Sequence, residues 1–436
     1  MSKKKIKVGV VGGYRGTGMI NYCKIADNAE IVAICDNNVD ILNEQKERCK
    51  DYDITYYEDF EDFIKHDMDA VVLANYANEH APFAIKAMKS GKHVYSEVLP
   101  VQTMKEAVEL IEAVEETGMI YAYGENYCYM PAPYEMKRLY QLNKIGEFEY
   151  GECEYIHNCE PIWPDITYGD ESHWRNNMYS TFYCTHSLGP IIHATSLRPV
   201  KVIGFESTMN ERPLRCGYKG GLFGIEMVTL ENGGIIKSIH GNLYKDSIWY
   251  SMYGSKGRME IPREDARAEH IFRLYVNSDE FSGEYPKRDC LENYKPVREF
   301  DKVGGHFGHG GSDFYSMYHF AEKVLGNPDA DIIDVYEALD MFLPGMFAYR
   351  SILNGGIPMD IPNLRDKSER EKWRNDIACT DPKVAGDMLL PTAVGGTPDI
   401  DKSVYKLMEQ KWIDGQEKED GYRKTALKQS SSEDNK

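Results

Sequence analysis

The first 36 residues place a strand, a glycine-rich turn, a helix and a second strand in direct succession, and this order most constrains the fold. Residues 6–11 form an apolar run, and glycines follow at positions 12, 13, 16 and 18. A helix is predicted over 19–27, and a second apolar strand over 29–35 is closed by Asp36. In such a unit the amides at the helix start receive a pyrophosphate and the acid binds a ribose diol. The sequence therefore predicts a dinucleotide site.

The glycine fingerprint is imperfect, but the units after it support the same fold. Aligned on Gly13 and Gly16, the first glycine position of G-x-G-x-x-G is held by Val11. Further strands over 70–75 and 92–97, with a helix over 80–90 between them, predict a doubly wound parallel sheet. Asp36 has no neighbouring arginine, which favours NAD over NADP as cofactor.

Three polar side chains fall where the strands of this sheet end, which is where ligands bind in such folds. Asn75, His80 and Glu97 lie at these ends or just beyond them. An alternative interpretation is that His80 and Glu97 only cap helices. The cofactor-binding residues predicted from this region are Gly13, Tyr14, Arg15, Gly16, Asp36, Asn75, His80, Glu97 and Val98, together with Asn126.

The overall charge and cysteine content restrict the partners and the compartment. The 436 residues carry a formal charge of −19, which argues against nucleic acid or an anionic membrane surface as a partner. No window approaches the roughly 20 apolar residues of a membrane helix, and the start of the chain has no signal-peptide pattern. Ten cysteines without regular spacing fit buried thiols in a reducing cytoplasm. We therefore expect a cytoplasmic protein that binds a small molecule.

The rest of the chain predicts a second, α+β domain with a large, mainly antiparallel sheet. Alternating segments over 200–206, 223–230, 235–241 and 247–253 are typical of strands, and Gly-Gly and Asn-Gly turns separate several of them. Helices are predicted over 313–325 and 332–353. We expect a nucleotide domain over 1–127, a substrate and oligomerisation domain over 128–390, and a partly disordered extension over 391–436 with a short helix at 404–412.

The glycine turn, Asp36, the stretch from Asn75 to His80, and Glu97 together resemble the Gfo/Idh/MocA oxidoreductase family over about residues 5–127. This resemblance implies a sheet domain that holds the substrate against the nicotinamide and commonly forms a dimer or tetramer. Ordinary dehydrogenases of the family use a lysine, an Asp and a His. On an approximate alignment Val98, Thr185 and Gly189 stand at these three positions.

Five ordered motifs are similar to one branch, the NAD-dependent glycosidases of glycoside hydrolase family 109. Departures are Leu99, Cys184, Ser187 and a divergent stretch over 207–305, which leave the substrate open. The motifs are 125–129 (ENYCY), 146–147 leading to 155–158 (YIHN), 173–175 (HWR), 183–190 (YCTHSLGP) and 308–314 (GHGGSDF).

The mechanism that this resemblance implies is redox-neutral. NAD takes hydride from C3 of a sugar, the ketone acidifies C2, the C1 substituent leaves, water adds, and the hydride returns to C3. His186 is the first candidate base for the C3 hydroxyl, and Tyr183 and Tyr155 are candidates for the C2 proton, although a tyrosine needs a lowered pKa to act as a base. Glu125 is expected to face the nicotinamide or the sugar. The predicted catalytic residues are His186, Tyr183, Tyr155 and Glu125, and the predicted substrate-binding residues are Arg175, Thr185, Asn126 and His309.

Two other functions and a metal site remain open on the sequence. One alternative is an NAD-dependent sugar or cyclitol dehydrogenase in which Tyr or His replaces the lysine, and another is an inactive relative that binds nucleotide or sugar. Clustered bases argue against the inactive relative. His306 and His309 are possible metal ligands, but a flexible glycine-rich loop is the simpler interpretation, and no metal is predicted.

Overall fold

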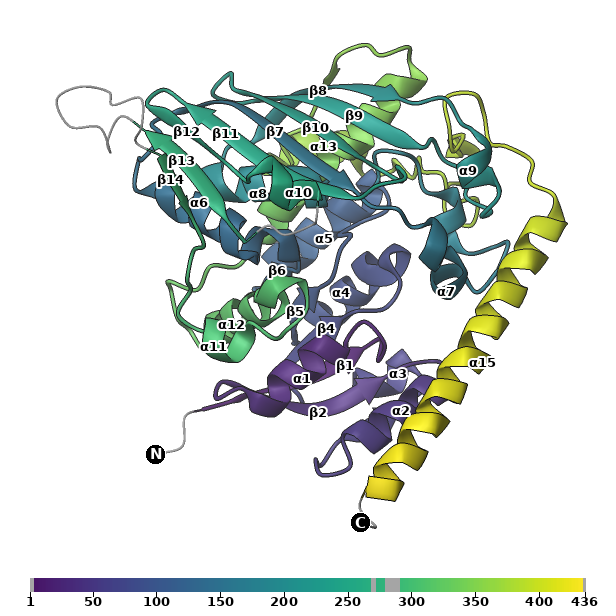
Figure 1. Cartoon of the computed structure of the whole chain (residues 1–436). Helices are drawn as coiled ribbons and strands as arrows, with labels where there is room; N and C mark the ends of the chain where they lie inside the picture. Colours follow the sequence, from purple (N-terminus) through teal and green to yellow (C-terminus); the bar gives the residue numbers. More distant parts are fainter. Residues whose placement is uncertain (1–3, 268–271, 279–290, 434–436) are drawn as a thin grey trace.

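The computed structural model describes residues 4–267, 272–278 and 291–433. It contains a six-stranded parallel sheet in the order β3-β2-β1-β4-β5-β6 and a nine-stranded, mainly antiparallel sheet (Figure 1). The predicted fold class is thereby confirmed. The elements of the first sheet and its helices are β1 (Ile6–Val11), α1 (Thr17–Ile25), β2 (Ala29–Cys35), α2 (Val39–Arg48), β3 (Thr55–Tyr57), α3 (Phe60–Phe63), β4 (Ala70–Leu73), α4 (His80–Lys89), β5 (His93–Ser96), α5 (Met104–Thr117) and β6 (Tyr121–Tyr123).

The turn between β1 and α1 requires glycine at two positions. Gly12 has φ +89°, and a Cβ there would lie 2.3 Å from the carbonyl oxygen of Ala74. A Cβ on Gly16 would lie 2.4 Å from the carbonyl oxygen of Gly12. Only glycine allows backbone segments to approach this closely at a positive φ. The missing first glycine of the fingerprint is thus replaced by Gly12, one residue later.

The second sheet has the order β14-β13-β12-β11-β7-β10-β9-β8-β15. It is not a simple meander, because β7 lies between β10 and β11 and runs parallel to β10. The predicted turn at Asn232 and Gly233 joins β9 to β10. The remaining elements are α6 (Pro131–Gln141), β7 (Phe148–Ile156), α7 (Trp163–Thr167), α8 (Thr185–Thr195), β8 (Pro199–Glu206), α9 (Glu211–Leu214), β9 (Phe223–Leu230), β10 (Ile235–Gly241), β11 (Ser247–Gly254), β12 (Gly257–Glu260), α10 (Arg263–Arg267), β13 (Leu274–Ser278), β14 (Leu291–Tyr294), α11 (Asp301–Gly304), α12 (Ser312–Val324), α13 (Val335–Leu353), β15 (Met359–Asp360), α14 (Lys367–Trp373) and α15 (Lys402–Glu433).

Helix α12 returns from the second domain to pack on the first sheet, beside α1 and β5 (Figure 1). The hydroxyls of Tyr95 and Ser316 are 2.9 Å apart, and the rings of Tyr22 and Phe314 meet edge to face at 5.1 Å. The two domains are therefore joined by α12. This helix begins almost 190 residues after Tyr123, the last residue of the first sheet, and packs on the nucleotide domain.

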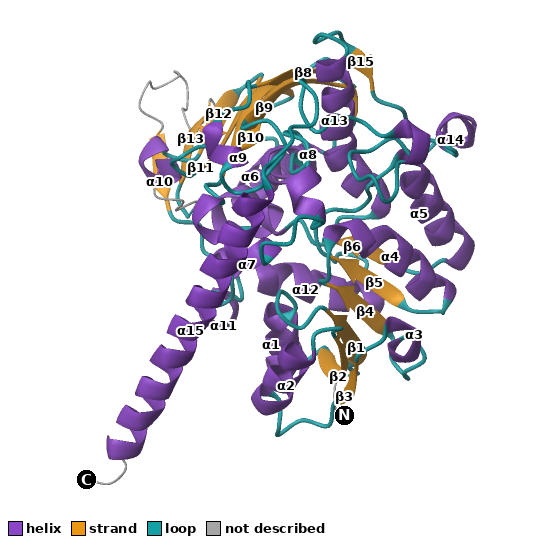
Figure 2. Cartoon of the chain, turned by 90° about the vertical axis from the view of Figure 1, so that its right-hand side faces the viewer, coloured by secondary structure: helices purple, strands orange, loops and turns teal. Residues whose placement is uncertain are grey.

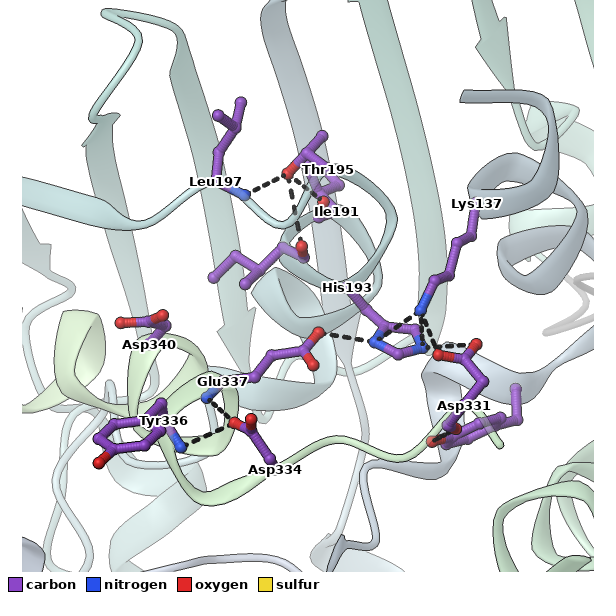
Figure 3. Close-up of polar contacts among 12 residues, drawn as sticks. Lys137, Ile191, His193, Thr195, Leu197, Asp331, Asp334, Tyr336, Glu337 and Asp340 are labelled. Atoms are coloured by element: carbon purple, nitrogen blue, oxygen red, sulfur yellow. Dashed lines mark hydrogen bonds and ion pairs between the residues drawn. The ribbon is translucent and has the colours of Figure 1, made fainter. Parts of the chain in front are cut away.

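A buried polar network fixes α8 against α6 and α13. Figure 3 shows Lys137, His193, Asp331 and Glu337 pointing toward one another. The Lys137 ammonium donates to Asp331 at 2.6 Å and to Nε2 of His193 at 2.8 Å, while Nδ1 of His193 lies 2.6 Å from Glu337. Burial alone would raise the pKa of Asp331, but His193 and Lys137 hold it well below its usual range. The network sets the position of α8.

The C-terminal helix is longer than the sequence predicts. A short helix over 404–412 followed by a disordered tail was expected, whereas α15 spans Lys402–Glu433 and projects from the rest of the molecule (Figure 2). Its Lys, Glu and Gln residues are good helix formers, which favours a helix over this charged segment.

Two expectations about the chain as a whole can be compared with the structure. No helix within the described ranges is long and apolar enough to cross a membrane. The nine cysteines that the structure describes are free thiols, and all but Cys159 are buried. The tenth, Cys290, lies outside the described residues.

The network around α8 predicts a large effect of Lys137→Ala on stability. Removal of the ammonium leaves Asp331 without its buried cation, and we expect the free energy of unfolding to fall by about 3 kcal/mol. Chemical denaturation measures this value. Lys105→Ala, which removes an exposed pair with Glu109, is the control and should cost at most about 0.5 kcal/mol. Equal losses in the two variants would contradict the stabilising role of the network.

Candidate active site

Asp36 lies beside the glycine turn at the end of β2. One carboxylate oxygen accepts from the amide of Gly13 at 2.8 Å, and the other accepts from the amide of Asn38 at 2.8 Å. Tyr14, on the outer side of this turn, is 79% exposed. The carboxylate is therefore held at the sheet edge where the fold binds a ribose.

His80 has a structural role in this edge. Its Nδ1 lies 2.9 Å from the carbonyl oxygen of Leu99 and its Nε2 lies 3.3 Å from that of Asn75, so the ring joins the loops after β4 and β5. Burial lowers the pKa of His80 to about 4, and the ring is neutral at physiological pH. Val98 packs, half-buried, against the core in the second of these loops.

A second polar cluster joins the two domains through Arg15. Its guanidinium contacts Glu97 at 2.6 Å and forms two hydrogen bonds to Asp313 at 3.0 and 3.1 Å. Asn126 donates to Asp313 at 3.2 Å, and His309 lies 3.4 Å from the same carboxylate. Burial works against protonation of His309, but the Asp313 carboxylate raises its pKa above the usual value.

The sheet edge fits NAD on observations of this chain alone. Side chains are excluded at Gly12 and Gly16, so a pyrophosphate can approach the backbone of the turn closely, and Asp36 stands at the ribose position. The buried amide oxygens of Asn75 and Asn126 have no hydrogen-bond partner among the residues that the structure describes. Buried polar atoms are nearly always bonded, so these two atoms point to a polar ligand.

Glu125 and His186 form the central pair of the site. Glu125 follows β6 and is fully buried, and His186 lies in the first turn of α8. The two side chains are joined by a hydrogen bond of 2.7 Å between Nδ1 of His186 and Oε1 of Glu125. The sequence predicts that Glu125 faces the nicotinamide or the sugar; in the structure its carboxylate contacts the imidazole of His186.

The space beside Gly189 is filled by Glu125. A Cβ at Gly189 would lie 2.9 Å from Cγ of Glu125, so a side chain at position 189 and the present position of Glu125 exclude each other. Thr185 is also buried, and its hydroxyl accepts from Tyr123 at 3.3 Å.

Tyrosines surround the imidazole of His186. The ring centroids of Tyr127, Tyr155 and Tyr183 lie 4.5, 4.7 and 5.8 Å from it. Burial raises the pKa of Tyr155 well above its usual range. Burial also raises the pKa of Tyr183, but the guanidinium of Arg175, 5.5 Å from the ring, opposes this rise. A tyrosine needs a lowered pKa to act as a base, whereas the pKa of Tyr155 and the pKa of Tyr183 are both raised.

A cavity of about 100 Å³ opens beside Tyr155, Tyr183 and Arg175. Apart from His157, which belongs to the 155–158 motif, the other residues of its wall come from separate strands and loops without a shared motif, so the sequence does not predict them. His240 could have been noticed as a histidine at an inward-facing position of a predicted strand. A larger cavity of about 270 Å³ between α6 and α12 contains none of the predicted residues. The further wall residues of the smaller cavity include His157, Trp163, Tyr218, His240 and Asn242.

No group of three or more His, Cys, Asp or Glu side chains suited to a metal ion occurs in the described part of the chain. His309 pairs with Asp313 instead.

The family comparison agrees with the nucleotide site. Residues 6–125 match the model of the oxidoreductase family with an NAD-binding Rossmann fold, Gfo/Idh/MocA. The predictions of this family, of NAD as the cofactor and of an NAD-dependent enzyme are thereby confirmed.

Curated relatives extend the similarity beyond the Rossmann domain. A glycosyl hydrolase family 109 protein of Solibacter usitatus is 27% identical over 409 residues, which cover 85% of this chain and 89% of the relative. A glycosyl hydrolase family 109 protein 2 of Shewanella sp. strain MR-4 is 29% identical, with 83% and 85% covered. The predicted resemblance to this branch is confirmed at the level of sequence similarity.

Solved structures support the fold. A levoglucosan dehydrogenase in complex with NADH and levoglucosan superimposes with a TM-score of 0.66 at 17% identity and covers 82% of this chain and all of that one. A scyllo-inositol dehydrogenase of Lactobacillus casei with bound NAD(H) and scyllo-inositol gives 0.61 at 16% identity, with 82% and 99% covered.

The close approach of position 189 to Glu125 predicts that Gly189→Ala displaces the Glu125 side chain. The added methyl overlaps the Glu125 side chain, and we expect the free energy of unfolding to fall by about 1 to 3 kcal/mol. Denaturation measures the loss, and a crystal structure of the variant measures the displacement. Gly395→Ala, with no atom within 4 Å of the added methyl, is the control. An unchanged free energy of unfolding would show that the Glu125 side chain moves aside without cost, which would contradict the predicted clash.

The buried His80 predicts a pH dependence of stability. The unfolded chain binds a proton near pH 6.5 and the folded protein only near pH 4, so stability from this group is complete above 6.5 and is lost as the pH falls toward 4. His80→Gln should reduce the slope of unfolding free energy against pH by about 1.4 kcal/mol per unit in this window. An unchanged slope would contradict the neutral, buried state of His80.

Proposed function

We propose that this protein is a redox-neutral, NAD-dependent glycosidase, which oxidises C3 of a sugar transiently, eliminates the C1 substituent, adds water and reduces C3 again. The observation that carries the proposal is the Glu125–His186 pair, whose imidazole is packed by Tyr155 and Tyr183, two residues that line a cavity. Bound NAD supplies a reversible hydride acceptor for C3. Asp36, Asn75, Glu97 and Asn126 are proposed to hold it, with the glycine turn.

His186 is proposed to take the proton of the C3 hydroxyl as the hydride leaves C3. An ionised Glu125 accepts the Nδ1 proton of the imidazole, so the lone pair of Nε2 is free to receive a second proton. The resulting imidazolium is stabilised by the buried carboxylate. When the hydride returns, His186 gives the proton back to the C3 oxygen, which closes the cycle.

The two tyrosines are proposed to divide the elimination between them. The Arg175 guanidinium opposes the burial of Tyr183 and favours its phenolate, so we assign the C2 proton to Tyr183. Tyr155 has no such cation, remains protonated, and donates its proton to the leaving oxygen as the C1–O bond breaks. In the second half a water adds at C1 and gives a proton to Tyr155, while Tyr183, whose hydroxyl proton exchanges with solvent, gives a proton to C2. The sum is hydrolysis.

A conventional NAD-dependent sugar or cyclitol dehydrogenase is the second candidate. The raised pKa of both Tyr155 and Tyr183 favours it, because the Glu125–His186 pair alone suffices for oxidation of an alcohol, without any proton transfer at C2. An inactive relative is disfavoured, since a buried carboxylate paired with a histidine is costly to maintain without a function.

The wider predictions of a homo-oligomer and a cytoplasmic location belong to the same proposal. The outer face of the second sheet carries exposed apolar side chains, among them Phe205 and Ile235, and this supports association of copies through that face. The free thiols support a reducing compartment.

Aryl glycosides in both anomeric series test the proposed reaction. We expect catalytic release of the aglycone without net NADH, and His186→Ala should lower kcat by at least about 100-fold while the protein keeps its NAD. Absorbance at the aglycone and NADH wavelengths in one cuvette measures both. Net NADH without aglycone would favour the dehydrogenase instead.

Two further variants assign the individual roles. Tyr183→Phe should abolish elimination but leave hydride exchange at C3, because it removes only the C2 base. The control Tyr150→Phe alters a tyrosine that packs on Tyr253, away from His186, and should leave kcat unchanged. If Tyr183→Phe and Tyr150→Phe behaved alike, the assignment of the C2 base would be wrong.

A further inference from the structure

A segment of the second domain reaches across to the nucleotide domain. This segment, Trp163–Asn177, contains α7 and the short turn of helix at 174–177, and is called the strap below. Its residue Tyr168 ends α7 in a left-handed conformation, with φ 56°, and Gly169 follows with φ 71°. These two residues turn the chain sharply, which places Tyr168 and His173 on the side that faces the Rossmann domain.

The strap meets the Rossmann domain at Tyr76, which follows β4. The rings of Tyr76 and His173 meet edge to face at 5.1 Å, and the hydroxyls of Tyr76 and Tyr168 interact electrostatically. Tyr76 is next to Asn75, whose buried amide oxygen has no partner among the described residues. The Asp36 charge acts on both Tyr76 and Tyr168, so the contact lies close to the predicted ribose position.

His173 provides an independent indication of a ligand. Its Nδ1 accepts from the amide of Arg175 at 3.3 Å, and burial, together with the Arg175 charge, lowers the pKa of His173 to about 4. The ring is therefore neutral, with its proton on Nε2. The residue is 5% exposed, yet Nε2 has no acceptor in the part of the chain that the structure describes. A buried N–H donor of this kind calls for an acceptor from a bound molecule.

Helix α15 fixes the strap from outside, and both overall views place it along α7 (Figures 1 and 2). A Cβ on Gly169 would lie 2.3 Å from the backbone nitrogen of Glu409, so the turn of the strap packs directly on the helix backbone. The rings of Tyr168 and Trp412 meet edge to face at 5.2 Å, and Met408 packs with Trp163 in a small buried cluster. The first three turns of α15 therefore hold both ends of α7.

We propose that Tyr168 and His173 are cofactor-binding residues contributed by the second domain, and that α15 clamps the strap over NAD so that the cofactor is retained between turnovers. A phenol and an imidazole N–H are suited to the oxygens of a ribose or a pyrophosphate. The advantage of retaining the cofactor rests on the proposed function. A redox-neutral cycle never needs to exchange its cofactor, whereas a dehydrogenase must release NADH after each turnover.

The test measures release of NADH, with no sugar present. The full-length protein is loaded with NADH, an excess of NAD is added, and the fall of NADH fluorescence gives the dissociation rate. We expect His173→Phe, which keeps a ring and removes the N–H donor, to release NADH about tenfold faster than the wild type. The same increase is expected for Trp412→Ala, which removes the contact of α15 with Tyr168. Leu407→Ala, on the same helix but 52% exposed, is the control and should match the wild type.

The possible outcomes separate this inference from the proposed function. Circular dichroism and thermal unfolding establish that each variant is folded, and Tyr168→Phe provides a milder change of the same contact. Release that is faster in the His173 and Trp412 variants supports the inference even if no aglycone is ever released. Release within twofold of the wild type in all three strap and clamp variants would overturn it, whatever the activity of the enzyme.

Discussion

The hydrogen bond between Glu125 and His186 is the interaction on which the site depends. It joins the end of the last Rossmann strand to the start of α8, so it crosses from the nucleotide domain to the substrate domain. It engages Nδ1 of His186 and leaves Nε2 free of Glu125. The Glu125 side chain fills the space that a side chain at position 189 would need. A base that works against bound nicotinamide must be held in one orientation, and here the orientation comes from a buried carboxylate.

The rest of the structure holds the two partners of this bond in place. On one side, the network of Lys137, His193, Asp331 and Glu337 anchors the far end of α8. On the other, α12 and the pairing of Arg15 with Asp313 join the second domain to the glycine turn. Both clusters bury charge: the first fixes α8 against α6 and α13 within the second domain, and the second fixes the geometry between the domains.

The sequence predicts much of this arrangement, and its limits have physical causes. The parallel sheet, the glycine turn and Asp36 follow from local patterns, and the motif that contains Tyr183 and His186 places them one helical turn apart. The partnership of Arg15 with Asp313 joins residues 298 positions apart, and no local pattern encodes it. Similarly, His80 was predicted to bind the cofactor, but its two contacts with backbone carbonyls depend on the path of two separate loops. The pKa directions of Tyr155 and Tyr183 depend on burial, which becomes known only when the domains are assembled.

The measurement that most directly tests the central claim is hydrolysis of a glycoside substrate in deuterated water, followed by mass and NMR analysis of the released sugar. Elimination through a C3 ketone breaks the C2–H bond in every turnover, and the account predicts solvent deuterium at C2. Displacement at C1 by paired carboxylates never breaks that bond. Released sugar with no deuterium at C2 would contradict the redox-neutral mechanism, even if NAD were bound at the predicted site.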